Sequence, residues 1–402
     1  MATEEGRHND FSRGINNTMP GNQMPEGFVR DALNLEPHGN SLSLRAGYEK
    51  VLPGENIRGV AALESRLVFV DGDELKIYDL STREQATVAT VPAKGAFVST
   101  VFNNELFFQV GAHRYRYDGH ELRRWGVPDV LAQPGVTAHN PTTEDHGDRQ
   151  VAMTWVNERG EEGGTVRPAL VPSGNFYEVQ VPEREGMTAR IYMSPVAGNT
   201  LYWQADFTQP GTYPISNPRD DTAPLETVGM RAPPVGHLMD TRGGFICIAQ
   251  GSYVFFTEPF KPHLVDMRQN FLQYPERIGM MLSGRSGVYI SADECYVVRG
   301  VETPQVEQQP VLNYPAVEGS GTITEDGRAA WVTQHGLAIE GEEGAIEEPN
   351  RGVFSPREAE EGTMGYVNNG GRQMLVASMK GRKGGTGQLA AGDFFEAEVV
   401  KK

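Results

Sequence analysis

Two short segments contain residue types that could form a nucleophile or a phosphate site. SGRSG, at residues 283–287, places serines beside glycines, but it misses the G-x-S-x-G spacing of a nucleophile elbow and stands at the start of an expected hairpin. GRKGGTGQ, at residues 381–388, has the glycines and the lysine of a phosphate-binding loop, but in the wrong order and with no helix after them. We therefore interpret the first segment as a turn and the second as a loop.

Acidic residues and histidines could bind a metal or act as an acid–base pair. DGDE, at residues 71–74, resembles the opening of a calcium loop but lacks the rest of that pattern. The histidines include no H-E-x-x-H, and no Cys–His spacing suits zinc. The acid pairs at 161–162 and 342–343 lie in glycine-flanked loops, whereas glycosidase carboxylates need rigid placement. We expect no metal, no cofactor and no catalytic residues.

One acidic position does recur. Asp79 and Asp118 each follow a tyrosine at the end of an expected strand and precede a turn. A propeller enzyme would repeat acids or histidines at one position of successive blades, whereas an Asp at a turn accepts hydrogen bonds from the next backbone N–H groups. We interpret both residues as closing turns, and we expect the protein not to be an enzyme.

Composition excludes other classes. The chain has 402 residues, with 36 Lys and Arg against 53 Asp and Glu, for a formal charge of −17, which disfavours a protein that grips nucleic acid through phosphates. No apolar run approaches the roughly 18 residues of a membrane span, and the first residues do not resemble a signal peptide. We expect a protein without a membrane span, made in the cytoplasm, with Cys247 and Cys295 as buried apolar side chains.

The elements that would hold any site repeat along the chain. Residues 64–80 and 103–119 superpose with a constant offset of 39, and each reads as an alternating strand, a turn and a second strand. A second series, in which residues 243–259, 286–300 and 328–344 are successive hairpins, has offsets of 42 or 43, as between Tyr289 and Trp331 and between Val297 and Ile339. Hairpins at such periods are typical of β-propeller blades.

Between the two series lies a stretch of different texture. Residues 127–230 contain four or five strands separated by Gly, Pro and Asn, and they have the size of a small β-sandwich. The sequence thus predicts an all-β protein. It comprises an N-terminal arm at 1–55, a first propeller segment at 56–126, an inserted β-sandwich (immunoglobulin- or fibronectin III-like) at 127–230, and a second propeller segment with a closing strand at 231–402. The propeller would have about six blades.

The arm fits neither pattern. It either packs along the rim, with a strand supplied to the last blade, or reaches a neighbouring subunit. Apolar side chains on a weakly patterned segment favour the second alternative, because they would otherwise stay uncovered. The candidate residues of such an oligomer interface are Phe11, Ile15, Phe28, Leu33, Leu42 and Tyr48.

The order of these segments resembles that of virion structural proteins of tailed bacteriophages, over most of the chain up to about residue 300. The lead-in motifs F-x-x-G-I-N-N, P-E-G-x-x-R-D-A-x-N and L-x-x-R-x-G-Y match at Phe11, Gly14, Ile15, Asn16, Asn17, Pro25, Glu26, Gly27, Arg30, Asp31, Ala32, Asn34, Leu42, Arg45, Gly47 and Tyr48. WVNERGEEGG with ARIYMSPVAGNTLYWQADF is similar to the fibronectin-like insert of such proteins, and YVFFTEPFKPH to the blade that follows it. The lead-in departs from the family at Ala46, where a proline is expected.

Within that group the resemblance implies the tail nozzle of short-tailed phages. It implies a homo-oligomeric ring, a hexamer by analogy, below the portal and adaptor and near tail fibres or spikes. Phage DNA would pass through during genome ejection without specific binding, as the negative charge favours. The location would be the virion, after assembly in the host cytoplasm.

Two other functions remain open. A tail-tip or fibre-associated protein would bind a receptor or glycan, for which Trp125, Trp155, Trp203 and Trp331 could stack on sugars, although core packing is the commoner role of such residues. A propeller glycosidase is the enzymatic alternative.

Overall fold

The structure is a computed structural model that describes residues 10–30, 32, 35–38, 40–44, 50, 52, 54–141, 147–301, 303, 305–356, 359–369, 371–381 and 393–398. Among these residues the regular structure is almost entirely β-strand, and the helical elements are the short 3-10 turns η1 (Gly21–Gln23) and η2 (Glu342–Gly344). The expected all-β class is confirmed. No helix among the described residues has the length and apolar character needed to cross a membrane.

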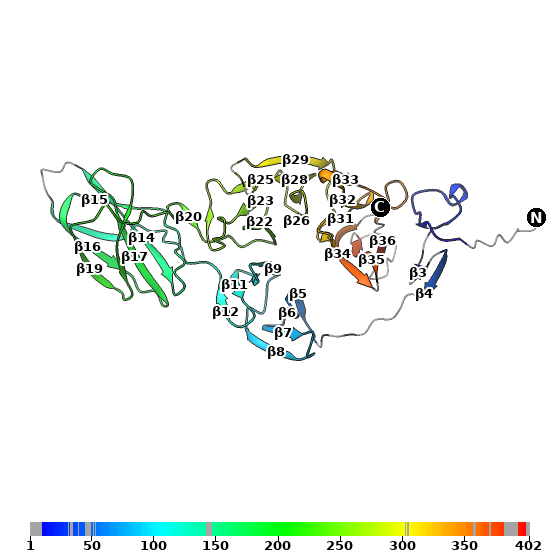
Figure 1. Ribbon diagram of the computed structural model, residues 1–402, viewed down its shortest axis with the longest axis horizontal. Coiled ribbons are helices and arrows are strands. Elements are labelled where there is room, and N and C mark those ends of the chain that lie inside the picture. The colour runs from blue at the N-terminus through cyan, green and yellow to red at the C-terminus, as the bar shows by residue number, and fades with distance from the viewer. Residues whose placement is uncertain are drawn as a thin grey trace, which may run out of the picture. The chain divides into compact units, whose positions relative to one another are not determined.

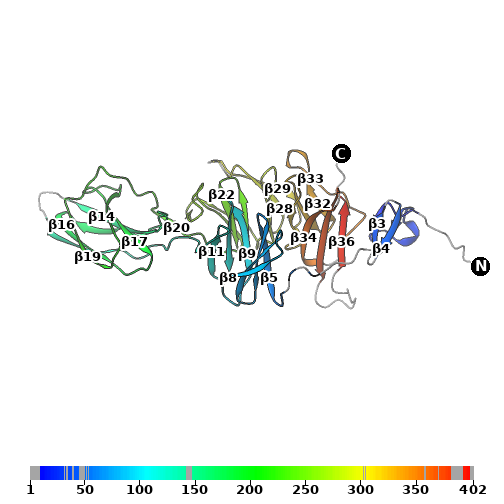
Figure 2. The same cartoon turned by 60° about the horizontal axis from the view of Figure 1, so that its bottom comes forward.

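The chain divides into two compact units. Figures 1 and 2 label the strands of both units. Unit 1 comprises Met1–Glu55 with Tyr274–Lys402, and unit 2 comprises Asn56–Gln273. Each unit contains three antiparallel sheets in which the strands pair in chain order. We number these sheets 1 to 3 in unit 2 and 4 to 6 in unit 1.

Unit 2 begins with sheets 1 and 2 and ends with sheet 3. Sheet 1 contains β5 (Ile57–Leu63), β6 (Arg66–Asp71), β7 (Glu74–Asp79) and β8 (Gln85–Thr90). Sheet 2 contains β9 (Phe97–Phe102), β10 (Glu105–Val110), β11 (His113–Tyr117) and β12 (Leu122–Arg124). Sheet 3 contains β21 (Leu238–Arg242), β22 (Phe245–Gln250), β23 (Tyr253–Phe256) and β25 (Phe271–Gln273).

The offset of 39 holds in the register of sheets 1 and 2. Leu67 pairs with Tyr78 in sheet 1, and Leu106 pairs with Tyr117 in sheet 2. The turn between the paired strands has the same length in both sheets, so every further pair keeps the offset. The predicted pair of equivalent hairpins is confirmed.

Alternate residues of a strand point to opposite faces, which explains the packing of sheet 2. Leu106 and Phe108 of β10 contact the core shared with sheet 1, whereas Phe107 between them joins the core shared with sheet 3. The first strands of these sheets are neighbours: the Thr100 and Thr241 hydroxyls lie 2.7 Å apart, linking β9 to β21. Sheet 2 is therefore covered on both faces.

Residues between sheets 2 and 3 form two further sheets. Seven strands make them: β13 (Gly135–Pro141), β14 (Asp148–Asn157), β15 (Ala169–Pro172), β16 (Gly174–Val181), β17 (Met187–Met193), β18 (Tyr202–Phe207) and β19 (Gly211–Ser216). The orders are β13-β16-β19 and β15-β14-β17-β18, and one core holds both sheets together. We call this pair the two-sheet insert.

Two details of the insert differ from the expectation. The prediction of four or five strands was too low, because β13 carries His, Asn and Pro and β15 has only four residues, so neither shows a strand pattern. The strand order is also not that of an immunoglobulin domain, in which the first, second, fourth and fifth strands share one sheet. The proposed domain boundaries stay a prediction.

Unit 1 contains sheets 4 to 6. Sheet 4 comprises β26 (Met280–Ser283), β27 (Val288–Ser291), β28 (Cys295–Arg299) and β29 (Glu307–Leu312). Sheet 5 comprises β30 (Thr322–Ile323), β31 (Ala329–Thr333), β32 (Gly336–Glu340) and β33 (Ile346–Glu347). Sheet 6 comprises β34 (Ala359–Asn369), β35 (Arg372–Gly381) and β36 (Asp393–Glu398).

The offset of 42 fails for the second strands of sheets 4 and 5. Tyr289 pairs with Val297, but Trp331 pairs with Ala338, so Val297 corresponds to Ala338 and not to Ile339. Three residues separate the strands at the β27–β28 turn and two at the β31–β32 turn, which shifts the register by one. Ala338 and Ile339 are both buried, so hydrophobicity does not distinguish the two alignments.

Sheet 5 is covered on both faces, as sheet 2 is. Ala329 and Trp331 pack in the core shared with sheet 4, and Ala330 and Val332 pack in the core shared with sheet 6. Every residue of β31 and β32 is consequently buried. These strands read as continuous apolar runs because each face has its own partner sheet.

The N-terminal arm forms its own small pairs. β1 (Gly14–Ile15) pairs in parallel with β2 (Phe28–Val29), and β3 (Leu35–His38) forms a hairpin with β4 (Ser41–Leu44). The expected arm strand in the last sheet is not found among the described residues, since sheet 6 is completed by β36.

The SGRSG segment is a turn, as predicted, and it surrounds a buried carboxylate. Glu340, at the end of β32, is fully buried and accepts hydrogen bonds from the backbone N–H groups of Arg285 (2.9 Å), Ser286 (2.7 Å) and Ala329 (3.1 Å). Burial acts to raise the pKa of Glu340, but the Ser286 hydroxyl and these N–H groups outweigh it, so the pKa lies below its ordinary value. The serine-rich loop thus binds the chain's own acid.

Replacing Glu340 with Gln should destabilise unit 1 by about 2 kcal/mol, because an amide NH₂ would face backbone donors that now bind a charged oxygen. Chemical unfolding followed by far-UV circular dichroism measures the loss. Glu342→Gln, at an exposed position two residues away, is the control and should change the free energy of unfolding by less than about 0.5 kcal/mol. Equal losses in both variants would contradict the proposed role of the buried carboxylate.

Candidate functional site: the joint between sheet 2 and the insert

The chain enters the two-sheet insert at residues 127–130 and leaves it at residues 227–231, and both segments contact residues 163–166, between β14 and β15. We call these three segments the neck. The Val130 N–H donates to the Gly164 carbonyl (2.9 Å), and the Gly229 N–H donates to the Thr165 carbonyl (2.8 Å). Thr165, in the middle, is fully buried and bridges to both Val130 and Val228. The neck therefore holds the entry and exit strands together at one place.

Two glycines make this approach possible. A Cβ at Gly163 would lie 2.8 Å from the Pro128 carbonyl oxygen, and a Cβ at Gly164 would overlap the Met230 carbonyl oxygen. Both neighbours are backbone atoms, which cannot turn aside as a flexible side chain would. The GG of WVNERGEEGG is required by the close contact of three backbone segments.

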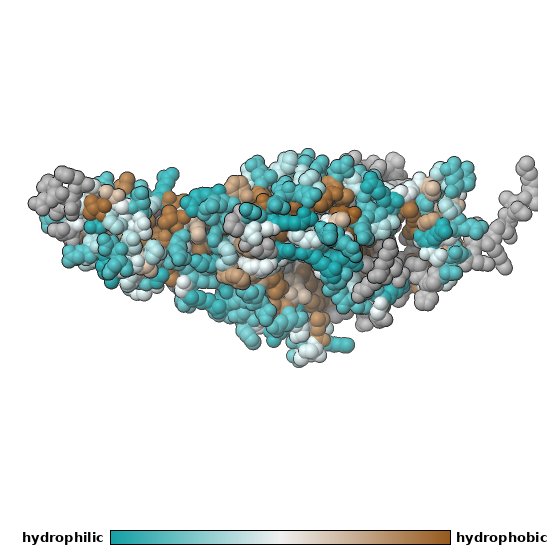
Figure 3. All heavy atoms as spheres, turned by 45° about the horizontal axis from the view of Figure 1, so that its top comes forward, coloured by the Kyte–Doolittle hydropathy of each residue, from teal (hydrophilic) through white to brown (hydrophobic). Residues whose placement is uncertain are grey.

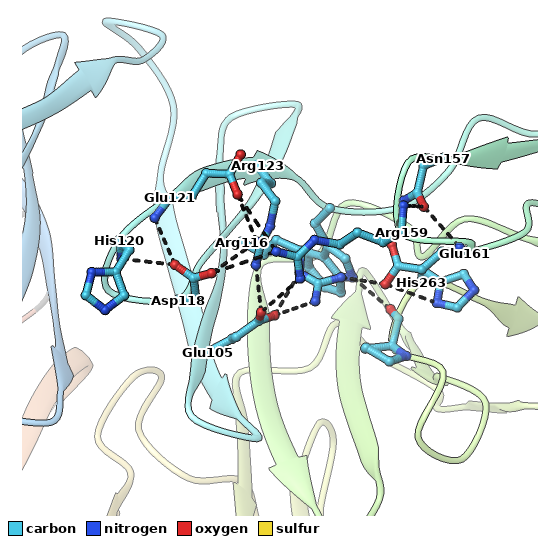
Figure 4. Close-up of polar contacts among 12 residues, drawn as sticks. Glu105, Arg116, Asp118, His120, Glu121, Arg123, Asn157, Arg159, Glu161 and His263 are labelled. Carbon is cyan, nitrogen blue, oxygen red and sulfur yellow. Dashed lines mark hydrogen bonds and ion pairs between the residues drawn. The ribbon is translucent and has the colours of Figure 1, made fainter. Parts of the chain in front are cut away.

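An ionic cluster links the neck region to sheet 2 (Figure 4). Arg116 of β11 is buried and lies at its centre: its Nε donates to Glu105 Oε2 (2.7 Å), and its Nη1 donates to Glu161 Oε1 (2.6 Å). Glu105 belongs to β10, whereas Glu161 belongs to the insert, in the turn after β14. One guanidinium thus bridges two structural elements, and its charge-assisted hydrogen bonds fix the direction of the contact.

Two further arginines surround this pair. Arg123 of β12 donates to Glu105 Oε1 (2.7 Å) and lies 3.0 Å from Asp118 Oδ2. Arg159, from the insert, lies 3.8 to 3.9 Å from Glu105, Asp118 and Glu121 and is 45% exposed. We call these residues the joint cluster: Glu105, Arg116, Asp118, Glu121, Arg123, Arg159, Glu161 and His263.

Hydrogen bonds within the turn after β14 orient Glu161 toward Arg116. Asn157, at the end of β14, accepts hydrogen bonds from the Arg159 and Glu161 N–H groups (3.0 Å each), and its amide donates to Glu161 Oε2 (2.7 Å). Burial acts to raise the pKa of Glu161, but the Asn157 amide and the Arg116 charge hold it below its ordinary value. Glu161 is therefore an ionised carboxylate in a partly desolvated site.

His263, in the segment after β23, is the titratable group of the joint cluster that burial affects most clearly. It is 8% exposed, and its Nδ1 lies 3.8 Å from Glu161 Oε1. Burial lowers the pKa of His263, and the nearby Glu161 carboxylate only partly opposes this effect. The imidazole is therefore neutral at neutral pH.

Acidification should weaken unit 2 through His263. The unfolded chain takes up a proton near the ordinary His pKa of about 6.5, and the folded chain only at lower pH, so the free energy of unfolding falls as the pH drops below about 6.5. His263→Gln should show a smaller fall between pH 7 and pH 5.5, measured by urea unfolding at each pH. His120→Gln, at an exposed position, is the control. A slope unchanged by His263→Gln would contradict this origin of the pH dependence.

Glu162, the residue after Glu161, interacts with side chains of the insert itself. It accepts hydrogen bonds from the Thr154 hydroxyl (2.6 Å) and the Tyr192 hydroxyl (2.8 Å) and pairs with Arg190 at 3.3 Å. Burial, followed by the Glu162 charge, raises the pKa of Tyr192. The two adjacent carboxylates therefore have separate partners: Glu161 contacts Arg116 of sheet 2, and Glu162 contacts side chains of the insert.

The recurring aspartates close turns, as predicted. Asp79 accepts hydrogen bonds from the N–H groups of Ser81 (2.9 Å) and Thr82 (3.1 Å), and Asp118 accepts them from His120 (2.9 Å) and Glu121 (2.8 Å). The Ser81 hydroxyl and these N–H groups lower the pKa of Asp79 to about 2. Asp118 has an additional role that the sequence did not indicate, because it also faces Arg123 in the joint cluster.

The aromatic and sulfur residues are mostly in cores. Trp125, Trp155 and Trp331 are buried, whereas Trp203 is half-buried and has the Arg219 guanidinium 4.9 Å from its ring centre. Core packing is thus confirmed for three of the four tryptophans. Both cysteines are buried free thiols, as expected. Within the described ranges, no three His, Cys, Asp or Glu side chains are placed to hold a metal ion.

The predicted interface residues of the arm are only partly brought together. Gly14 and Ile15 pair with Phe28 and Val29, so Ile15 and Phe28 share one strand pair, whereas Leu42 lies in the β3–β4 hairpin. Phe11, Ile15, Phe28 and Leu42 are all half-buried. Leu33 and Tyr48 lie outside the described residues. Their role in an oligomer interface stays a prediction.

Sequence reasoning missed the joint cluster. The sequence marks Glu161 only as half of an acid pair, and it gives no reason to select Arg116, Arg123 or His263. Glu105 begins β10 and Arg116 lies near the end of β11, and these are the two central strands of sheet 2; a charged residue in a central strand is the one signal that could mark them. Their partner on the insert is 45 residues further along the chain from Arg116.

Comparison with known proteins identifies no family. No family model matches the chain. No curated protein matches it either. Three solved structures among those similar to this chain are BBS1N in complex with ARL6DN, Citrobacter koseri AztD and Kluyveromyces lactis Hsv2.

These structural similarities are remote. BBS1N is 11% identical, with 83% of this chain and 93% of that chain covered and a TM-score of 0.34. AztD is 9% identical, with 80% and 79% covered and a TM-score of 0.35. Hsv2 is 9% identical, with 86% and 98% covered and a TM-score of 0.33. At these TM-scores the similarities carry no argument about function.

Proposed function

We propose that the protein is a non-catalytic structural subunit of a bacteriophage tail, and that it forms the nozzle ring below the portal and adaptor. The observation that carries the proposal is the connection of the insert to sheet 2 through the neck and the joint cluster. The segment WVNERGEEGG, on which the resemblance to phage virion proteins rests, supplies the Asn157 turn, the Glu161 ion pair and the neck glycines. A particle component that carries an additional domain needs that domain held in a fixed direction. The contacts of this segment with sheet 2 and the neck support such a role.

We infer that the six sheets are the blades of one propeller, with residues 127–230 inserted between the second and third. The sheets are antiparallel with strands in chain order, and within each unit they pack face to face. The first strands also contact each other in series, β5 with β9 and β9 with β21 in unit 2, and β26 with β30 and β30 with β34 in unit 1. In a propeller the first strands of successive blades surround the central axis and lie next to each other, so these contacts support the propeller arrangement.

Charge supports a conduit that does not retain DNA. A formal charge of −17 on each copy would be multiplied around a hexameric ring and would repel phosphates. The surface visible in Figure 3 is largely hydrophilic, with apolar residues in scattered patches. The partners in this proposal are further copies of the chain, the portal and adaptor, and tail fibres or spikes. The location is the virion.

The proposal is tested on particles and on the purified protein. Gold-labelled antibody against the protein should bind DNA-filled phage particles at the tail end of one vertex, and native mass spectrometry should give a closed ring of six copies. Absence of label on every particle would overturn the virion assignment. A glycan array screened with the same protein would then test the receptor-binding alternative.

A further inference from the structure

The arm contacts the body of unit 1 through a small, specific contact. The Asn17 N–H donates to the Val353 carbonyl (3.1 Å), the Asn17 amide donates to the Ser355 carbonyl (2.7 Å), and the Ser355 N–H donates to Asn17 Oδ1 (2.9 Å). The Thr18 hydroxyl adds a bond to the Gly352 carbonyl (2.7 Å). An asparagine side chain offers one acceptor and donors on the same short stem, so it can pair with both polar groups of a backbone residue.

The preceding asparagine shapes the arm for this contact. Asn16 is 1% exposed, and its Oδ1 accepts hydrogen bonds from the N–H groups of Thr18 (3.3 Å) and Met19 (3.1 Å). The Asn16 N–H in turn donates to the Val29 carbonyl (2.8 Å). Residues 16–18 thus form a turn, fixed by the arm itself, that presents Asn17 outward. We call residues 16–18 the tongue.

The receiving segment is held in place by contacts that do not involve the arm. The Val353 and Phe354 N–H groups donate to the Asn350 carbonyl (3.0 Å each), and the Ser355 hydroxyl donates to the Gln334 carbonyl (3.0 Å). Gln334 lies in the β31–β32 turn of sheet 5. Residues 350–355, which we call the docking site, are therefore held by bonds to their own body as well as by bonds to the tongue.

We propose that in the assembled ring this docking site takes the tongue of a neighbouring copy, and this inference rests on the proposed homo-oligomer. Twelve residues lie between the end of β4 at Leu44 and the start of β5 at Ile57, and an extended segment of that length would span about 43 Å from Leu44 to Ile57. That length matches the diameter of a domain of this size. The contact is made of the same atoms whether the tongue comes from its own chain or the next, which is the condition for exchange between copies.

Each copy then donates one tongue and accepts one, which closes a ring. The half-buried side chains of Ile15 and Phe28 travel with the tongue on the same strand pair and would be covered further by the second copy. The exchange would give the hydrogen bonds between Asn17 and Ser355 a function in assembly.

Cross-linking between two single-cysteine chains tests the inference. In both chains Cys247→Ala and Cys295→Ala first remove the native thiols. One chain carries Thr18→Cys and the other Val353→Cys, because the Thr18 hydroxyl lies 3.3 Å from the Val353 carbonyl oxygen. The two chains are mixed before assembly, treated with a short bis-maleimide and separated on a denaturing gel. A band at twice the chain mass is expected, and each single-cysteine chain alone gives the background.

Specificity is measured with a matched pair of substitutions in the Thr18→Cys chain. Asn17→Leu keeps the shape but removes the amide, and it should lower the interchain product roughly tenfold or more, because its side-chain hydrogen bonds are lost. Asn22→Leu, at an exposed position in η1, should leave the product unchanged. Equal yields of interchain product from the two variants would show that docking does not depend on the Asn17 amide, which would contradict the inference.

The outcomes separate this inference from the proposed function. If native mass spectrometry shows a ring but a chain with both cysteines cross-links only within itself, the arm docks in its own copy and the exchange is wrong while the ring stands. If the chain stays monomeric, the ring itself is wrong and the exchange falls with it.

Discussion

Replacing Arg116 with Met should lower the free energy of unfolding of unit 2 by about 3 kcal/mol, because it leaves Glu105 and Glu161 as buried charges without their shared partner. Glu161 has a side chain 19% exposed and Glu105 one 17% exposed, so water cannot fully replace the guanidinium. These acids outweigh the effect of burial and raise the pKa of Arg116, so no accessible pH removes its charge. Urea unfolding followed by tryptophan fluorescence, to which Trp125 of this region contributes, measures the loss.

The cluster supplies its own control. Arg159→Met removes the same side chain from a position that is 45% exposed and 3.8 to 3.9 Å from its acids, and it should cost less than about 1 kcal/mol. Adding Glu161→Gln to Arg116→Met should restore part of the loss, because one unpaired charge disappears. Similar losses for Arg116→Met and Arg159→Met, with no recovery in the double variant, would show that the buried ion pair does not hold the joint.

Gly164→Ala should destabilise unit 2 by about 3 kcal/mol or more, because the new methyl group would overlap the Met230 carbonyl oxygen. Relief requires one neck segment to move away, which would break the hydrogen bond from the Val130 N–H to the Gly164 carbonyl. We expect a lower thermal midpoint and faster protease cleavage near residues 127–131 and 227–231.

Gly365→Ala is the matched control. Gly365 lies in β34, and a Cβ there would meet no atom within 4 Å. The substitution should be neutral or slightly stabilising, since alanine restricts the unfolded chain more than glycine does. If both variants behave alike, the neck does not depend on close backbone contact.

The sequence predicts the hairpins well and the joint poorly, for physical reasons. The register of sheets 1 and 2 follows from one constant offset, because Leu67–Tyr78 and Leu106–Tyr117 are linked by turns of equal length. The offset fails at Ile339, where a turn is one residue shorter and all the candidate partners are buried. A pattern of hydrophobicity alone cannot register strands that are buried on both faces.

The joint depends on contacts between residues far apart in the sequence. Arg116 meets Glu161 only because the neck brings the turn after β14 back to β11. The same limit applies to the arm: Asn17 belongs to a motif visible in the sequence, but its partner Ser355 is 338 residues away. Turn chemistry, by contrast, is local, and the roles of Asp79 and Asp118 could be inferred from their neighbours.

Because sheet 5 is buried on both faces, one of its faces stays exposed during synthesis until the next sheet has been made, and the nascent chain can aggregate in that interval. When the ribosome has released β31 and β32, the face formed by Trp331 can already cover itself against sheet 4, but Val332 and Leu337 still await sheet 6. Until β34 and β35 emerge, this uncharged, β-prone surface is exposed to other nascent chains. Low temperature or chaperone co-expression should therefore raise the yield of recombinant protein, and a stop codon between β33 and β34 should yield inclusion bodies.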